Sequence, residues 1–144
     1  MKTHHVFFFA VVGLAAYMHL SHKDNPTQQA QAAKADVHPY LGQICKATAA
    51  MTFGHAYKIV KLDRIDEGIA YVHYLRPSDS SRWAIKCKLE SDKVVWASDN
   101  PESTGRWRND PADVVITFSI HDNKLNLKQV HSDGSGESKT YSIN

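Results

Sequence analysis

"RWAIKCKLE", residues 82–90, places successive side chains alternately on two faces. One face carries Trp83, Ile85, Cys87 and Leu89, and the other carries Arg82, Ala84, Lys86, Lys88 and Glu90. An alternation with a period of two predicts a β-strand with one buried face. The stretch therefore places Cys87 among buried residues, and the next question is which group of the chain it meets.

The second of the two cysteines, Cys45, lies in "YLGQICKATAAMTFG", residues 40–54. Apolar and small residues recur there at helical spacing, and Gly54 follows them where a helix C-cap is expected. Cys45 then faces the same way as Leu41 and Ile44. The chain has no CxxC and no cysteine–histidine spacing typical of zinc, so we expect neither a metal site nor a cofactor.

The amino-terminal segment, residues 1–22, has a basic start and an apolar run from Val6 to Leu20. This run suits the core of a signal peptide and is shorter than the ~20 apolar residues of a membrane-spanning helix. Small residues suited to cleavage, Ala15 and Ala16, are followed at once by Tyr17 and Met18, which favours an uncleaved signal anchor over a cleaved signal peptide. Both alternatives predict export, either to the periplasmic side of the inner membrane or into the periplasm.

A polar linker over residues 23–38 and a folded domain over residues 39–144 follow this segment. Of the 17 Lys and Arg and 15 Asp and Glu residues, three basic and one acidic residue precede Asp36. The remainder of the chain is therefore neutral. A neutral domain is not expected to bind nucleic acid, because that needs several phosphates neutralised at once.

An exported chain with one cysteine on each of two buried faces predicts a disulfide between Cys45 and Cys87. Such a bond would attach the helix to the sheet. The alternative is a reactive Cys87 whose thiol pKa is depressed by Lys86 and Lys88. These lysines point to the opposite face of the strand, so the disulfide is favoured.

Further stretches with strand composition follow each other, separated by turns rich in Gly, Asn, Asp and Ser: 56–65, 69–77, 82–90, 93–98, 113–120, 124–130 and 139–143. Connections this short exclude helical crossovers. The sequence therefore predicts an α+β domain, with one amphipathic helix packed on an antiparallel meander of about seven strands. The sheet either curls around the helix or partly closes into a barrel.

One connection, residues 98–113, is long and carries Trp107 between Arg106 and Arg108. Long loops in compact domains are often functional, and Trp and Arg are favoured binding anchors. Together with Arg82, Lys86 and Lys88, these residues predict a local basic patch that binds a partner. The alternative is that "GRWR" is a short strand with Trp107 in the core.

Three segments, "CKATAAMTFG", "RWAIKCKLE" and "GRWRNDPAD", together resemble a type of small exported bacterial cell-envelope protein to which no activity is assigned. The resemblance covers most of residues 41–143. It implies a disulfide-linked fold and an envelope location, and it implies no catalytic residue.

Two classes of function fit these observations. The first is a non-enzymatic module that binds a protein partner at the cell envelope, as an accessory, immunity, exclusion or inhibitor protein does. An uncleaved amino-terminal helix would also hold it in the membrane. The second is a small envelope hydrolase that uses His73 or His121 with a nearby carboxylate. The first is favoured, because no nucleophile motif or phosphate-binding loop occurs in the sequence.

Overall fold

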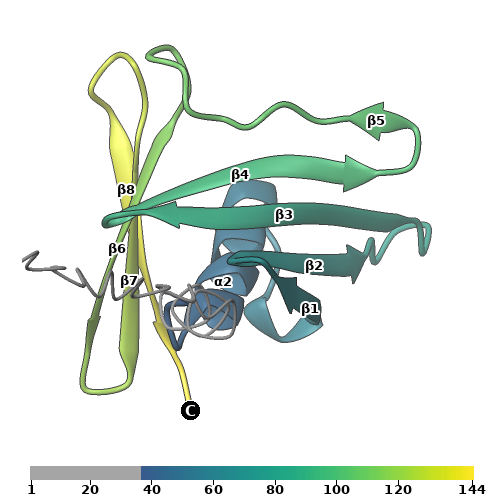
Figure 1. Ribbon diagram of the computed structural model, residues 1–144, viewed down its shortest axis with the longest axis horizontal. Helices are drawn as coiled ribbons and strands as arrows, with labels where there is room; N and C mark the ends of the chain where they lie inside the picture. Colours follow the sequence, from purple (N-terminus) through teal and green to yellow (C-terminus); the bar gives the residue numbers. More distant parts are fainter. Residues whose placement is uncertain (1–36) are drawn as a thin grey trace, which may run out of the picture.

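Helix α2 (Leu41–Phe53) lies inside a curled antiparallel sheet in the computed structural model, which describes residues 37–144 (Figure 1). The expected signal helix, residues 1–22, and almost all of the expected linker lie outside the described residues. Within the described part, no helix is both long and apolar enough to span a bilayer.

The sheet is a meander of seven strands in the order β1-β2-β3-β4-β6-β7-β8, and every neighbouring pair is antiparallel. Its strands are β1 (Lys61–Asp66), β2 (Ile69–Leu75), β3 (Arg82–Glu90), β4 (Lys93–Asn100), β6 (Val115–His121), β7 (Lys124–Val130) and β8 (Gly136–Ser142). The two-residue strand β5 (Ser103–Thr104) pairs with β4 outside this order. The predicted α+β class and antiparallel meander are confirmed.

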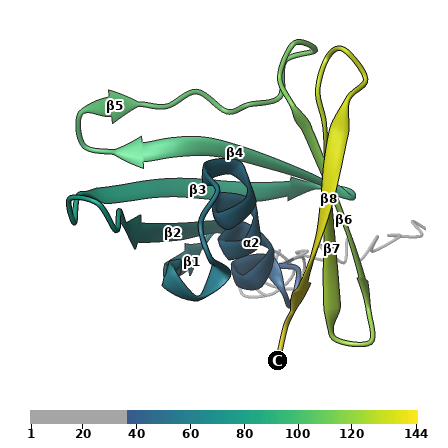
Figure 2. The ribbon, with the colours of Figure 1, turned by 180° about the vertical axis from the view of Figure 1, so that it is seen from behind.

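The sheet curls around the helix without closing into a barrel. Strands β6 to β8 cross the direction of β2 to β4 on one side of α2 (Figures 1 and 2). The helix accordingly contacts β1, β2, β3, β4 and β7. Strands β1 and β8 are the two ends of the order and do not pair. Tyr57, in the short 3-10 helix η1 (Tyr57–Ile59), bridges this gap by contacting Tyr141 of β8 at 5.6 Å between ring centroids.

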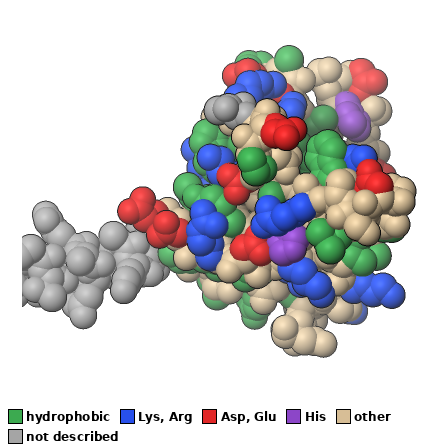
Figure 3. Space-filling view, turned by 90° about the vertical axis from the view of Figure 1, so that its right-hand side faces the viewer, with side chains coloured by type: hydrophobic (Ala, Val, Ile, Leu, Met, Phe, Trp, Pro, Cys, Tyr) green, Lys and Arg blue, Asp and Glu red, His purple; other side chains and the backbone are tan. Residues whose placement is uncertain are grey.

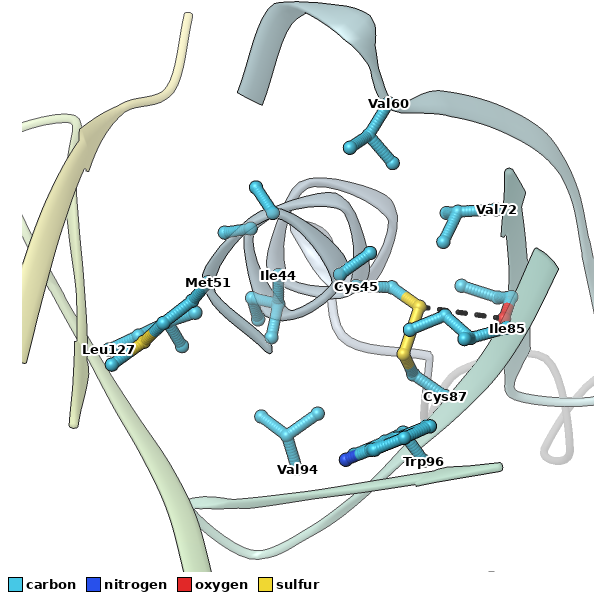
Figure 4. Packing of buried hydrophobic residues seen from close by; sticks show 14 of the residues in the cluster. Ile44, Cys45, Met51, Val60, Val72, Ile85, Cys87, Val94, Trp96 and Leu127 are labelled. Atoms are coloured by element: carbon cyan, nitrogen blue, oxygen red, sulfur yellow. Dashed lines mark hydrogen bonds between the residues drawn. A yellow bond between two sulfur atoms is a disulfide. The ribbon is translucent and has the colours of Figure 1, made fainter. Parts of the chain in front are cut away.

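Helix α2 is buried around most of its circumference, whereas an amphipathic helix was expected. Nine of its 13 residues are buried. Strands contribute side chains from several sides of the helix, with Leu127 on one side, Val72 and Ile85 on another, and Val94 on a third (Figure 4). The curl of the sheet explains the difference, since a curled sheet covers more than one face of a helix. Gly54 ends the helix in the left-handed conformation, at φ 69°.

A disulfide joins Cys45 of α2 to Cys87 of β3 (Figure 4). Both residues are fully buried, and Cys87 lies opposite Ala70 and Trp96 on the neighbouring strands. The predicted bond is confirmed, and the reactive-cysteine alternative is wrong, because the chain has no free thiol. Disulfides of this kind are typical of proteins that fold in an oxidising compartment outside the cytoplasm.

Five of the predicted strands have shifted boundaries, and two of them begin three or more residues from the predicted start. The first strand begins at Lys61 instead of residue 56, because η1 occupies residues 57–59 and Val60 is buried. The last strand begins at Gly136 instead of residue 139. A Cβ at position 136 would lie 2.3 Å from the carbonyl oxygen of Gln129. The absence of a side chain therefore lets the chain pair with β7 in a stretch whose composition predicts a turn.

Candidate binding surface on the outer face of the sheet

The long connection between β4 and β6 turns back at β5 and then follows the edge of β4. The Arg108 N–H donates a hydrogen bond to the Trp96 carbonyl at 2.8 Å. Gly105 permits this close approach, since a Cβ there would lie 2.5 Å from the backbone of Ser98. Residues 105–108 have irregular backbone, so Trp107 lies on a loop and not in a regular strand.

The Trp107 ring lies on the outer face of the sheet, away from α2. The ammonium groups of Lys86 and Lys88 lie 5.0 and 4.7 Å from its centroid. Opposite these lysines on β4 are Ala97 and Val95, which are 0% and 2% exposed although they belong to the outer face. Trp107 itself is half-buried. Its exposure is therefore intermediate between the two alternatives considered from the sequence, an exposed anchor and a core residue.

A second aromatic side chain continues this arrangement across the sheet. Tyr71 of β2 lies opposite Lys86 on one side and Arg64 of β1 on the other. The Arg64 guanidinium stacks over the Tyr71 ring at 3.6 Å from its centroid. We call Arg64, Tyr71, Lys86, Lys88 and Trp107 the outer patch. It consists of two aromatic side chains and three cations, each of which lies over one of the rings as cation–π contacts require.

The cations of the outer patch are only weakly neutralised by the protein. Among the ion pairs of residues 37–144, none involves Arg64 or Lys86. Lys88 lies 3.6 Å from Glu90 on the surface, a separation at which exposed pairs are weak. Figure 3 faces the right-hand side of the view in Figure 1, where β2 to β4 have one of their ends. Lys and Arg side chains lie beside hydrophobic ones on that side of the domain. The outer patch therefore presents positive charge beside aromatic surface.

The other predicted patch residues are engaged by other groups of the protein. Arg106 makes two hydrogen bonds of 2.7 Å to the Asp113 carboxylate, and its guanidinium holds the pKa of Asp113 down at about 2. Arg108 lies over the ring of Trp96, which points toward the helix. Arg82 pairs with Asp63 at 3.0 Å. The structure thus brings together Lys86, Lys88 and Trp107, and leaves the three arginines outside the outer patch.

A histidine–carboxylate pair lies nearby. His73 of β2 is hydrogen-bonded through Nδ1 to Asp63 at 2.7 Å, and Arg82 occupies the other oxygen of the same carboxylate. His73 also lines an open groove of about 470 Å³ with Lys58, Ile59, Lys61 and Leu75. The residues opposite His73 on the neighbouring strands are Lys61 and Ala84. A histidine–carboxylate pair of a hydrolase commonly activates a Ser, Thr or Cys nucleophile, and neither of these two positions carries one. His121, the other candidate, is exposed beside the turn of the β6–β7 hairpin.

Sequence reasoning missed Arg64, Tyr71 and Asp63. The register of β1 on β2 shifts between Leu62 and Arg64, which places Asp63 in a bulge and turns both Asp63 and Arg64 to the outer face. Simple alternation through "KLDRID" assigns these two residues to opposite faces. A bulge has no reliable signal in one sequence, so this part of the surface required the structure.

Comparison with known proteins gives no relative: no family model, no curated protein and no solved structure matches the chain. Among residues 37–144, no group of three or more His, Cys, Asp or Glu side chains is arranged to hold a metal ion.

Proposed function

We propose that this chain is a non-enzymatic module that binds a protein partner at the bacterial cell envelope through the outer patch. The observation that carries the proposal is the position of Trp107, held above Lys86 and Lys88 on the face of the sheet away from the core. Trp, Tyr and Arg, all three present in the outer patch, are enriched among the residues that contribute most to binding at protein interfaces.

The support of the outer patch favours recognition. Its cations stand on two strands of a paired sheet, Arg64 on β1 and Lys86 and Lys88 on β3. The sheet is attached to the helix by the disulfide. The loop that carries Trp107 is fixed by the bond from Arg106 to Asp113. A surface held in place before binding loses little conformational entropy when a partner docks. The partner would contribute acidic and apolar groups, because charges across an interface are usually complementary.

The location outside the cytoplasm is part of the proposal. The buried disulfide supports an oxidising compartment, and the apolar run from Val6 to Leu20 supports export. The test is a fusion of residues 1–40 to a reporter that is active only outside the cytoplasm. We expect an active reporter, and activity of a reporter that works only in the cytoplasm would contradict export.

Photo-crosslinking in living cells tests the binding surface with the full chain. A photoreactive amino acid would replace Lys86 in one strain and Lys128, an exposed lysine of β7, in another. We expect a covalent adduct with a specific envelope protein from position 86 and not from position 128. The same adducts from both positions, or none from position 86, would contradict the proposed surface.

A small hydrolase is the second candidate, and one observation favours it. His73 and Asp63 are hydrogen-bonded at 2.7 Å beside an open groove, as a general base and the carboxylate that orients it often are. The candidate requires hydrolysis of an ester, amide or glycosidic substrate that is lost in His73→Ala and Asp63→Asn. Equal activity in these variants and in the unchanged protein would exclude the pair as its site.

A further inference from the structure

Strand β1 is an edge strand whose outer edge is open. It lies at one end of the strand order and pairs with β2 alone. All six of its residues are exposed, and Leu62 and Ile65 are each 43% exposed. Beside Leu62 is an open hollow of about 360 Å³, which Lys46, Tyr57 and the carboxyl-terminal residues Ser142 and Asn144 help to line. Exposed edges with apolar residues are sites where a further strand can add.

The backbone of β1 directs two residues toward this open edge. Asp66 and Ile69 flank the two-residue turn Glu67–Gly68, whose φ angles of 48° and 74° suit a type I′ hairpin. The pair that closes such a turn exchanges hydrogen bonds, and the next pair does not. Ile65, opposite Ala70, therefore points its N–H and C=O outward.

Leu62 has the same orientation as Ile65. Leu62 lies opposite Val72, which is two residues from Ala70 on β2. Hydrogen-bonded and non-hydrogen-bonded pairs alternate along a strand, so Val72 and Ala70 both belong to non-hydrogen-bonded pairs with β1. Two donors and two acceptors of β1 are thus directed away from β2. Among residues 37–144, no other strand pairs with this edge.

The sequence of β1, "KLDRID", is complementary to itself when read antiparallel. If the midpoint between Asp63 and Arg64 is placed on a two-fold axis, Lys61 of one copy lies opposite Asp66 of the other. Leu62 then lies opposite Ile65, and Asp63 lies opposite Arg64. We propose that two copies of this chain pair through their β1 edges in this register.

The faces of the side chains agree with this register. Leu62 and Ile65 lie opposite the buried residues Val72 and Ala70, so both turn toward the core side and would meet each other across the axis. Asp63 and Arg64 both point outward because of the bulge, so their charges meet on one face. Opposite charges and paired apolar residues in directly opposed positions stabilise an antiparallel pair.

The pairing also fits the two outward-directed residues, because Leu62 of one copy would exchange hydrogen bonds with Ile65 of the other. An axis of this kind runs through the sheet from face to face, so both outer patches lie on the same side of one continuous sheet. A partner with two sites, or a partner that is itself a dimer, would then bind with avidity. The proposed pairing does not depend on the proposed function of the outer patch.

The dimer should be weak, because one pair of six-residue strands buries much less than the ~1,600 Å² of a stable interface. Sedimentation velocity of the full chain, with its disulfide intact, should therefore show a dimer that grows with protein concentration. Lys61→Asp places one like charge opposite Asp66 at each of the two ends of the pair and should weaken dimerisation about tenfold. Asp66→Lys alone should do the same.

The reversed double variant Lys61→Asp/Asp66→Lys restores the opposite charges and should recover the dimer. Ile65→Lys should abolish it, because lysine on an edge opposes strand pairing. Val115→Lys is the matched control, since Val115 is 39% exposed on β6, and it should leave the dimer unchanged. A monomer at every concentration would overturn the proposal, as would a dimer that is insensitive to Lys61→Asp and Ile65→Lys.

Amide hydrogen exchange locates the contact. Raising the concentration should slow the exchange of the Leu62 and Ile65 amides, which face the open edge. The Arg64 and Asp66 amides face β2 and should change little. Protection that appears at β8 or at the outer patch, with none at Leu62 and Ile65, would overturn the β1 pairing even if a dimer forms.

Discussion

Cys45 of α2 and Cys87 of β3 are joined through the core, with their Cα atoms 5.7 Å apart and 42 positions apart in the sequence. The bond attaches the helix to the centre of the sheet, because Cys87 is flanked by Ala70 of β2 and Trp96 of β4. The helix and the sheet are therefore joined by a covalent link of a kind that is typical of oxidising compartments.

We expect Cys45→Ser and Cys87→Ser each to lower the free energy of unfolding by about 3–4 kcal/mol, the value for a loop of this length in the chain-entropy model. The double variant should cost little more than either single variant, because both remove the same bond. Thermal melts of the three variants test this, and non-reducing mass spectrometry shows the linkage directly. Two free thiols in protein produced under oxidising conditions would contradict it.

The fold was largely predictable because its strongest signals are local. The alternation around Cys87 and the helical spacing around Cys45 correctly placed both sulfurs on buried faces. A curled sheet and a partly closed barrel remained equal alternatives in the sequence, since the curl arises from twist accumulated over seven strands and not from any one of them. The outer patch was predicted in part: Lys86, Lys88 and Trp107 meet, but Arg106 is held by Asp113, and no sequence pattern marks that pairing.

Acid should release the loop that carries Trp107 only at low pH. The Arg106 guanidinium lowers the pKa of Asp113 to about 2, below the ordinary value of 3.8. A carboxylate whose pKa is depressed on folding stabilises the native state above its unfolded pKa, and this contribution disappears as the pH falls through the folded value. The effect should thus be complete at neutral pH and be lost between about pH 4 and 2.

The Asp113 carboxyl signal in an NMR titration measures this directly, and Arg106→Ala should move its midpoint upward. In thermal melts, Asp113→Asn should lose less stability between about pH 4 and 2 than the unchanged protein does, because the variant lacks this carboxylate. An unchanged Asp113 midpoint in Arg106→Ala would show that the ion pair does not hold the carboxylate.

Gly105→Ala should displace the Trp107 loop from β4. The new Cβ would lie 2.5 Å from backbone atoms of Ser98, which cannot move without disturbing the strand. We expect a loss of about 1–3 kcal/mol in stability, as for other substitutions that overpack a close contact. Faster amide exchange at Arg108, which donates to Trp96, would locate the damage. A variant as stable as the unchanged protein would contradict the close approach.

Trp107→Ala should cost about 1–2 kcal/mol of stability, because the ring is half-buried on a surface and leaves no closed cavity. A core tryptophan would instead cost about 3–5 kcal/mol. A thermal melt separates the two values before any partner is identified. A loss in the larger range would make Trp107 part of the core and would remove it as a binding anchor.

The central claim is that the outer patch is a binding surface. Its most direct test is to measure how tightly the crosslinked partner binds variants of this protein in which the charge of the patch is reversed. Isothermal titration should compare the unchanged chain with Lys86→Glu/Lys88→Glu and with Lys128→Glu, whose lysine lies outside the patch on β7. We predict that the double reversal weakens binding by at least about tenfold, since it opposes an acidic partner, and that Lys128→Glu leaves the affinity unchanged. Equal affinity for all three proteins, each with its disulfide intact, would contradict the account.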